Sequence, residues 1–538
     1  MPNDSEALQR LLQADTRAES GGASLAAPIL VPGLTILHHP DAERAGERVA
    51  LAGLVSGRRE ALARGEPAFS QPGSALLRPL ADPYLSRQPI RILPGAEPGG
   101  IRLGCGESRT AVVVDGEPVA GDLEISPARL ERGAILLLAG RVVLLLSRLD
   151  PVGVASAPAF GLVGESAPML ALRREIQRVA GLDVPVLLRG ETGTGKELIA
   201  RALHDAGRRR ERPYLAVNMA AVPATLAAAE LFGASRGAYT GADRKRDGYF
   251  QRADGGTLFL DEVGETPPEV QALLLRALES REIQPVGSDE VRRVDVRLIA
   301  ATDADLEGSV AAGRFRAPLL HRLAGYDIRV PPLRERRDDF GRLFLHFVRL
   351  ELVGAGEASR LAVPPGRPSW IPAPLVARLA AFDWPGNVRQ LRNAARQIVI
   401  AGRDAGEPGM WLQAERLLQE AVRPAPPRDT DSTGAPLGET PPRKAYRSPE
   451  EVTDDELLAA LRVNRWRIQR AAAQLGISRG SLYDRIEKSQ RIRKAADLSR
   501  EEIEACRARC GGDLDAMVEA LEVSRRGLQR RMTQLGLP

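Results

Sequence analysis

Cysteine is scarce in this chain, which has three cysteines among 538 residues. So few cysteines cannot form the network of disulfide bonds that stabilises small secreted domains, and they fit a reducing cytoplasm. Long apolar runs are absent as well, because none approaches the roughly 20 residues that a helix needs to cross a bilayer. The most apolar stretch, residues 135–146, is too short and contains Arg141. We therefore interpret it as two paired strands.

A secretion signal is also missing. The first 20 residues are acidic and lack the basic-then-apolar order of a signal peptide. An apolar content of 43% with 27% charged residues is typical of a globular protein in water. We therefore expect a cytoplasmic protein with no membrane partner.

Excess positive charge is absent from most of the chain. From Glu456 onward there are 17 Lys and Arg against 11 Asp and Glu, whereas the preceding residues together carry a net charge of −1. A basic excess confined to one end is typical of a nucleic-acid-binding module. The chain is also too long for one core and should contain roughly three or four domains.

Composition divides the chain into five segments before this basic tail. Residues 1–30 are predicted to be a flexible tail, and residues 31–150 contain short β-rich runs split by Gly and Pro, which predict an antiparallel sandwich. In residues 158–330, apolar strands alternate with helical stretches, which indicates α/β organisation with a largely parallel sheet. Residues 331–402 are predicted to form a helical lid. Residues 423–450 are rich in Pro and polar residues and are predicted to be a linker.

A glycine-rich loop, GETGTGKE, follows an apolar strand and precedes a helical stretch. In such a loop, backbone N–H groups surround phosphates and the lysine reaches the β and γ oxygens of a nucleotide. The positive end of the following helix adds to this attraction. The predicted ATP-binding residues are therefore Gly190, Glu191, Thr192, Gly193, Thr194, Gly195, Lys196 and Glu197.

An acidic pair, Asp261 and Glu262, ends a second apolar strand. Alone, such a pair is usually a solvated strand end. Beside a phosphate loop it predicts nucleotide hydrolysis, with Asp261 holding magnesium and Glu262 polarising the attacking water.

The motifs in order resemble one known family. GETGTGKELIARALH, NMAAVPATLAAAELFGASRGAYTGA, GGTLFLDEVGE, RLIAATDADL, PPLRERRDD and WPGNVRQLRN are similar to the signatures of the NtrC-type, sigma-54-activating AAA+ family. They span about 245 residues, from 158 to 402. The generic phosphate loop ends in Ser or Thr, but Glu197 is usual in this family.

The resemblance implies further roles in ATP hydrolysis. Asn218 is similar to the switch asparagine that holds Glu262, and Thr302 occupies the first sensor position. Other implied nucleotide-binding residues are Val163, Gly164 and Arg389. Arg316 and Arg322 match two arginines that a neighbouring subunit supplies in a ring, which is hexameric in the family.

Several residues depart from the family pattern. Asp303 replaces the usual Asn after Thr302 and brings a negative charge toward the γ-phosphate. Ala317 and Pro318 replace an acidic-containing pair between the two arginines, and we expect Pro318 to bend their helix. Gln390 replaces Glu. These departures concern the rate of turnover rather than the existence of the site.

The hexapeptide GAYTGA resembles the GAFTGA loop with which the family contacts sigma-54. Its residues are Gly237, Ala238, Tyr239, Thr240, Gly241 and Ala242. The resemblance implies an ATP-dependent activator that remodels sigma-54 RNA polymerase from double-stranded DNA upstream of promoters. Two alternatives stay open: an AAA+ remodeller of another protein that uses DNA as a tether, and a DNA-binding scaffold with degraded catalysis.

The basic tail contains two similar helical units, at residues 455–490 and 498–538. The first resembles a Fis-like helix-turn-helix, and its predicted DNA contacts are Arg479, Ser481, Tyr483 and Arg485. The second has Glu522 where the first has the turn glycine, and its candidate contacts are Arg525, Arg526, Gln529 and Arg530. This second unit is expected to read DNA, to dimerise or to cap the first unit.

The N-terminal segment shows no aspartate embedded in the alternating strands and helices of a receiver domain. It weakly resembles a forkhead-associated sandwich, which recognises phosphothreonine proteins. The implied phosphate contacts are Ser86, Arg87 and Arg58. Because Pro89 replaces the usual His and Asp115 the usual Asn, a sandwich used only for protein contact is the alternative. The chain is thus predicted to be multidomain, with a β-sandwich, an AAA+ α/β domain with a lid, and an all-α helix-turn-helix tail.

Overall fold

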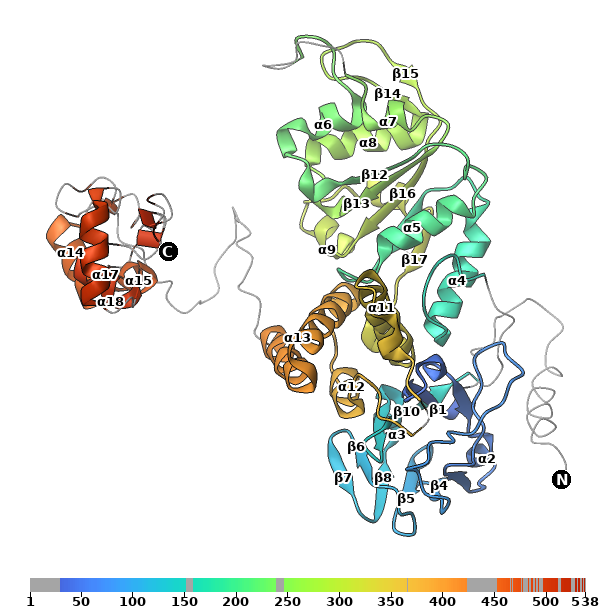
Figure 1. Cartoon of the computed structure of the whole chain (residues 1–538). Helices are drawn as coiled ribbons and strands as arrows, with labels where there is room; N and C mark the ends of the chain where they lie inside the picture. Colours follow the sequence, from blue (N-terminus) through green and yellow to red (C-terminus); the bar gives the residue numbers. More distant parts are fainter. Residues whose placement is uncertain are drawn as a thin grey trace. The chain divides into compact units, whose positions relative to one another are not determined.

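The computed structural model describes residues 30–150, 158–238, 246–364, 366–422 and, with interruptions, 452–537 (Figure 1). All of the predicted tail (residues 1–30) except Leu30 and all of the predicted linker (residues 423–450) lie outside this description. The chain divides into two compact units, residues 1–426 and residues 427–538. Among the described residues, every helix is too short or too polar to span a bilayer.

The first unit begins with two antiparallel sheets. The larger sheet has the order β2-β1-β10-β9-β6-β7 and contains β1 (Val31–His38), β2 (Arg48–Ala50), β6 (Val112–Val114), β7 (Glu117–Val119), β9 (Ala134–Leu138) and β10 (Val142–Leu149). The smaller sheet, β3-β4-β5-β8, contains β3 (Glu60–Leu62), β4 (Ile90–Pro94), β5 (Ile101–Gly104) and β8 (Asp122–Ile125). The short helices are η1 (Ala42–Arg44), α2 (Ala52–Val55) and α3 (Pro127–Arg132).

Three strands of the larger sheet, β1, β9 and β10, are buried on both faces. Leu136 and Leu144 point into the core shared with the smaller sheet, whereas Leu137, Val143 and Leu145 belong to a different apolar cluster. Strands covered on both sides have continuous apolar runs rather than alternation. This explains the apolar stretch at residues 135–146, whose predicted strand pairing is confirmed by the β9–β10 register.

The α/β part contains a parallel sheet with the order β12-β13-β16-β11-β17. Its strands are β11 (Val186–Arg189), β12 (Tyr214–Asn218), β13 (Thr257–Asp261), β16 (Arg297–Thr302) and β17 (Tyr326–Arg329). The predicted parallel sheet is confirmed. The short hairpin β14 (Glu282–Ile283) and β15 (Arg292–Arg293) lies apart from this sheet.

Helices cover both faces of the parallel sheet. Leu258 and Leu260 of β13 pack on one side and Phe259 on the other, as expected for alternating side chains. The side of Phe259 is covered by α4 (Ala167–Ala180) and α5 (Lys196–Asp205). The opposite cluster includes residues of α6 (Ala224–Phe232), α7 (Tyr249–Arg252), α8 (Pro268–Ser280), α9 (Leu306–Ala311) and α10 (Ala317–Leu323).

The lid follows as a set of helices. It contains η4 (Leu333–Glu335), η5 (Arg337–Asp339), α11 (Phe340–Gly354), η6 (Ala358–Leu361), α12 (Ala373–Ala380) and α13 (Asn387–Val422). The last helix is interrupted at Gly406, which is not helical, and Pro408 follows it. Met410, Ala414 and Leu418 pack into the lid core. The helical region therefore extends past residue 402, where the lid was predicted to end.

The larger sheet and the lid share one apolar cluster. Leu37 of β1 and Leu137 of β9 are buried with Phe340 and Phe344 of α11 and Leu379 of α12. Figure 1 shows these helices beside the sheet. The contact is very close at Gly341, where a β-carbon would lie 2.7 Å from Leu37 Cα. The N-terminal sheets are therefore packed onto the lid.

The second unit contains α14 (Asp454–Val463), α15 (Ile468–Leu475), α17 (Arg500–Arg509) and α18 (Leu514–Leu521). Capping boxes begin α14 at Thr453 and α17 at Ser499. Both helical units contribute to a single apolar core. Glu522, the residue at the turn-glycine position, has a φ of 53° and accepts hydrogen bonds of 2.7 and 3.0 Å from Arg462. The second helical unit thus packs against the first.

Two glycines of α11 provide a test of the contact between sheet and lid. Gly341→Ala must displace β1 or α11, and we expect it to lower the free energy of unfolding by about 1–3 kcal/mol. Gly354→Ala in the same helix meets no atom within 4 Å and should be neutral or slightly stabilising. Thermal unfolding of the full chain measures both variants. Equal effects of the two substitutions would contradict a tight contact between sheet and lid.

Candidate functional site

The glycine-rich loop connects β11 to α5. Gly193 and Gly195 have φ values of 80° and 101°, a backbone conformation that favours glycine. Lys196 Nζ donates to the carbonyl of Gly190 at 2.7 Å, and the Thr194 hydroxyl donates to the carbonyl of Glu191 at the same distance. The eight predicted residues therefore form the expected turn at the start of a helix.

The parallel sheet brings the predicted catalytic residues to one edge. Asn218 and Asp261 are register partners at the ends of β12 and β13, and Thr302 ends β16 opposite Arg189 of β11. Asn218 Nδ2 lies 3.4 Å from Asp261 Oδ2. In this structure the asparagine therefore contacts Asp261, rather than Glu262 as the resemblance implied. The Thr302 hydroxyl is buried and accepts a hydrogen bond from the Ala304 amide at 3.0 Å.

Glu262 and Asp303 are two carboxyl groups that interact beside the phosphate loop. Burial raises the pKa of Glu262. The charge of Lys196 lowers this pKa, whereas the charge of Asp303 and a hydrogen bond with Asp303 raise it further. Burial alone would raise the pKa of Asp303. Hydrogen bonds with Thr192 and Glu262 and the charge of Lys196 outweigh this effect, so the pKa of Asp303 is lowered. The Thr192 hydroxyl donates to Asp303. The replacement of Asn by Asp thus places a third carboxylate beside the acidic pair and the loop.

The carboxyl edge of the sheet suits a hard cation. Magnesium prefers oxygen ligands and binds through one or two carboxylates together with phosphate oxygens. Asp261 lies at this edge, and Glu262 follows it with a φ of 52°. Glu197, which stands where other phosphate loops have Ser or Thr, is exposed in the first turn of α5. The residues present therefore fit a magnesium ion held chiefly by Asp261.

Residues 163–166 are held by the lid. Asp339 Oδ1 accepts hydrogen bonds from the Glu165 and Ser166 amides at 2.6 and 2.9 Å, and Oδ2 accepts one from the Ser166 hydroxyl at 2.6 Å. Gly164 has a φ of 133°, and a β-carbon there would lie 2.8 Å from Asp339 Cγ. Only 1% of Asp339 is exposed. The predicted nucleotide-binding residues Val163 and Gly164 are thus fixed by a lid carboxylate that sequence reasoning missed.

A second lid residue that sequence reasoning missed holds the phosphate loop. Asn387 is fully buried and donates to the Glu191 carboxylate and the Thr192 carbonyl, both at 3.1 Å. Arg334 pairs with Glu191 at 2.6 and 2.8 Å, and this contact lowers the pKa of Glu191. Asn387 lies within the WPGNVRQ motif, which was the available signal. Nearby, the Arg389 amide donates to the Gly193 carbonyl at 3.2 Å, so the predicted sensor arginine is brought to the loop.

The two arginines predicted to act in trans lie at the two ends of helix α10. Arg316 precedes the helix with an exposed side chain, and Arg322 donates to the Leu278 carbonyl at 3.2 and 3.3 Å. Among the described contacts, neither guanidinium bonds to the phosphate loop of its own chain. Pro318 lies in the first turn, where a missing amide costs nothing. The expected bend is therefore wrong, because Pro318 starts the helix.

Two of the six residues in the predicted sigma-54 contact lie in the described part of the chain. Gly237 has a φ of 81°, and the Ala238 amide donates to the Ser235 carbonyl at 3.2 Å. Tyr239, Thr240, Gly241 and Ala242 lie outside the described residues.

The structure separates Arg58 from the other predicted phosphate contacts. Glu60 and Leu62 of β3 pair with Ile92 and Ile90 of β4, so Arg58 lies near the end of β4 whereas Ser86 and Arg87 precede its start. The grouping of Arg58 with them is therefore wrong. The arginine beside Ser86 is Arg64, whose amide donates to the Ser86 carbonyl at 3.0 Å.

Two other N-terminal residues have structural partners. Asp115 begins the turn between β6 and β7, and Arg129 donates to its carboxylate at 2.5 and 2.8 Å. The negative charge that Asp115 brings in place of the usual Asn is therefore already paired. Arg64 donates its guanidinium to the carbonyls of Pro83 and Leu85.

The predicted DNA contacts fall largely outside the described residues, as is the case for Arg479, Ser481, Tyr483, Arg525, Arg526 and Arg530. Gln529 is exposed. Arg485 donates to the Val452 carbonyl at 2.6 Å and pairs with Asp454 at 3.3 Å. Its assignment to DNA is corrected to an internal contact that fixes the start of α14.

Comparisons with known proteins agree with this geometry. Residues 162–329 match the family described as sigma-54 interaction domain, residues 334–433 the AAA+ ATPase lid domain, and residues 448–488 the Fis family of bacterial regulatory proteins. Transcriptional regulatory protein ZraR of Escherichia coli K12 is 42% identical over 333 residues, which are 62% of this chain and 70% of that protein.

Two further similarities extend over comparable lengths. The DNA-binding transcriptional regulator NtrC of a Bradyrhizobium strain is 37% identical over 392 residues, covering 68% of this chain and 78% of that protein. The crystal structure of NtrX from Brucella abortus in complex with ADP is 29% identical, with a TM-score of 0.43 and 70% coverage of both chains.

Proposed function

Because this chain belongs to the family of ATP-hydrolysing, sigma-54-dependent transcriptional activators, we propose that it remodels sigma-54 RNA polymerase from DNA sites upstream of promoters. The protein is an ATPase that activates transcription with sigma-54, and its helix-turn-helix tail binds DNA. The observation that carries the proposal is the assembled edge of the parallel sheet. There a phosphate loop, an acidic pair and two lid residues converge on one place.

Each residue at this edge has a chemical task. Backbone amides of residues 190–196 bind the ATP phosphates, and Lys196 neutralises the β and γ oxygens. Glu262 orients and polarises the attacking water, a task that suits a carboxylate whose pKa is raised by burial. A magnesium ion held by Asp261 would neutralise charge that develops on the phosphates. Asn218 contacts the Asp261 carboxylate, Thr302 occupies the first sensor position, and Arg389 contacts the nucleotide from the lid.

The hydrolytic site is completed by a neighbouring subunit. Arg316 precedes α10 and Arg322 lies in its last turn, and the described hydrogen bonds do not join them to the loop of their own chain. A guanidinium from an adjacent subunit would stabilise the charge of the transferring phosphoryl group, an effect of about 10³–10⁵ in rate. We therefore propose a closed ring, most simply a hexamer, in which ATP hydrolysis moves residues 237–242 against sigma-54.

Two substitutions separate hydrolysis from its use. Glu262→Gln should retain ATP binding and lose about 10²-fold or more in the rate of phosphate release, because the base is gone.

Tyr239→Ala should hydrolyse ATP at close to the normal rate but fail to form open complexes at a sigma-54 promoter, as measured by single-round transcription. Open complexes formed by Tyr239→Ala would favour the alternative, a AAA+ remodeller of another partner with DNA as a tether.

Mixing two inactive variants tests the ring. Arg316→Ala and Glu262→Gln should each be nearly inactive alone. In a randomly mixed ring, roughly a quarter of the sites combine an intact Glu262 with an intact Arg316 from the neighbour, so activity should partly return. Arg322→Ala offers a second partner for the same mixture. Absence of recovery, together with activity from a strictly monomeric wild type, would contradict the ring.

We further propose that the N-terminal sheets are forkhead-associated-like and bind a phosphothreonine protein through Ser86 and Arg87. Arg87 is exposed, and the Ser86 hydroxyl accepts a hydrogen bond from the Gln88 amide at 2.9 Å, which orders the loop. The pairing of Asp115 with Arg129 removes one objection to an anionic ligand.

Calorimetry of the full chain against a phosphothreonine peptide library and its unphosphorylated twin tests this partner. Binding should require the phosphate, disappear in Arg87→Ala and survive in Arg58→Ala, since Arg58 lies at the other end of the β3–β4 pair. A library without any phosphate preference would leave the sheets as a module for unmodified protein partners.

A further inference from the structure

A cluster of charged residues lies where the N-terminal sheets, the lid and the α/β part meet. The sheets contribute Arg48 of β2, the lid contributes Asp338, Asp339 and Arg342, and the α/β part contributes Glu165 and Arg173. Arg173 is 2% exposed and Asp339 1% exposed. Charges buried to this extent are stable only when each has a partner. The cluster therefore fixes the relative positions of the groups that compose it.

Residues 162–166 lie at the centre of this cluster and are held from three sides. Arg173 of α4 donates to the Glu165 carboxylate at 2.9 Å and to the Leu162 carbonyl at 2.7 Å. Asp339 of the lid accepts from the Glu165 amide at 2.6 Å. Arg48 Nη1 of the N-terminal sheets donates to the Glu165 carbonyl at 3.3 Å. The lid thus binds the amide of Glu165, and the sheets bind the carbonyl of the same residue.

Arg48 projects from a rigid strand. Its backbone pairs with Thr35 of β1, and it exchanges hydrogen bonds of 2.9 and 3.1 Å with Ser70 on its other side. β1 in turn packs on α11 through Leu37 and Gly341. Because β2 is paired with β1, a shift of Arg48 relative to the lid requires movement of β1, whose side chains lie in an apolar core.

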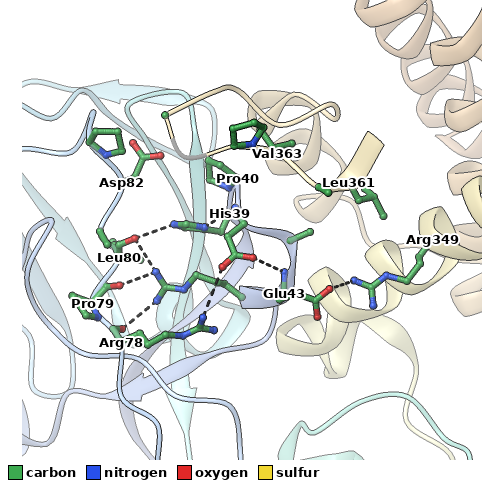
Figure 2. A pocket seen from close by; sticks show the side chains of 18 of the residues that line it. His39, Pro40, Glu43, Arg78, Pro79, Leu80, Asp82, Arg349, Leu361 and Val363 are labelled. Carbon is green, nitrogen blue, oxygen red and sulfur yellow. Dashed lines mark hydrogen bonds and ion pairs between the residues drawn. The ribbon is translucent and has the colours of Figure 1, made fainter. Parts of the chain in front are cut away.

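Polar contacts reinforce the seam between sheet and lid. Arg342 Nη2 donates to the Gly46 carbonyl at 3.2 Å, two residues before Arg48, and Arg349 pairs with Glu43 at 2.5 Å. Figure 2 shows the latter pair beside a cavity of about 1010 Å³ that both the sheets and the lid line. The seam is thus closely packed along β1 and α11 and open near His39 and Val363.

Burial and the neighbouring Asp339 raise the pKa of Asp338 to about 7, whereas the charges of Arg48 and Arg342 act to lower it.

We infer that Arg48 is a positioning residue for ATP, through which the N-terminal sheets hold residues 163–166 against the nucleotide. The inference rests on the proposed nucleotide-binding role of Val163 and Gly164. It assigns the N-terminal sheets a direct contact with the ATP site in the same chain. Any partner that displaces β2 then weakens ATP binding while leaving the phosphate loop and the acidic pair intact.

Steady-state ATP hydrolysis by full-length variants tests this inference. Arg48→Ala should raise KM for ATP about 3- to 10-fold, the effect of losing one charge-assisted hydrogen bond, with little change in kcat. Arg48→Lys, which keeps the charge, should recover part of this affinity. The matched control is Arg102→Ala, which removes an exposed arginine of β5 that pairs with Glu124 on the smaller sheet; its KM should equal that of the wild type.

A double-mutant cycle distinguishes positioning from general destabilisation. Asp339→Asn should also raise KM, and the double variant should raise it less than the product of the two single effects, because both residues hold Glu165. An Arg48→Ala protein with wild-type KM would overturn the inference. So would equal rises in KM for Arg48→Ala and Arg102→Ala, or a loss of affinity that only follows the melting temperature across all variants. A wild type without ATPase activity would instead contradict the proposed function.

Discussion

The buried carboxylate of Asp339 is the interaction on which the geometry of the ATP site depends. It accepts three hydrogen bonds from Glu165 and Ser166, which lie 174 and 173 residues earlier in the chain. A buried charge with this many donors is stable, whereas its loss would leave the donors without partners in a closed environment. In the same turn of the lid, Arg336 donates to the Thr194 carbonyl at 3.4 Å. One short stretch of the lid thus holds residues 163–166 and the phosphate loop together.

The N-terminal sheets belong to this arrangement because the lid supplies one wall of their packing. β9 and β10 have apolar side chains on both faces, and only one face is covered by the smaller sheet. Exposing the other face would place Leu137, Val143 and Leu145 in water at a cost of about 1.5–3 kcal/mol each. Contact with α11 and α12 avoids this cost. A displacement of the sheets would therefore reach the lid through a packed interface.

Local motifs explain which parts of the site could be predicted from the sequence. The phosphate loop and the acidic pair each lie within a few consecutive residues, and the parallel sheet brings them together because strand ends meet at one edge. Pairings between distant residues could not be predicted in this way. Asp339 and Asn387 lie within the PPLRERRDD and WPGNVRQLRN motifs, but they act on residues more than 170 positions away. A local motif does not show which distant residue such a side chain contacts.

The errors have a similar cause. Arg58 and Arg485 were assigned to ligands because they are basic and lie near suggestive residues. The register of β3 with β4 places Arg58 at the wrong end, and Asp454 together with the Val452 carbonyl engages Arg485. Correct assignment of either arginine requires knowledge of which strand or helix packs against the segment that carries it. Pro318 was misjudged for a smaller reason, since its effect depends on whether the helix begins before or after it.

Hydrogen–deuterium exchange of the Glu165 and Ser166 amides measures the central interaction most directly, since both amides donate to Asp339. In the full-length wild type, a peptide covering these residues should exchange slowly. In Asp339→Asn the same peptide should exchange faster, while peptides from β13 and β16 keep their protection. Unchanged exchange at residues 165 and 166 in a folded Asp339→Asn protein would contradict the account, because the lid would then not hold this part of the ATP site.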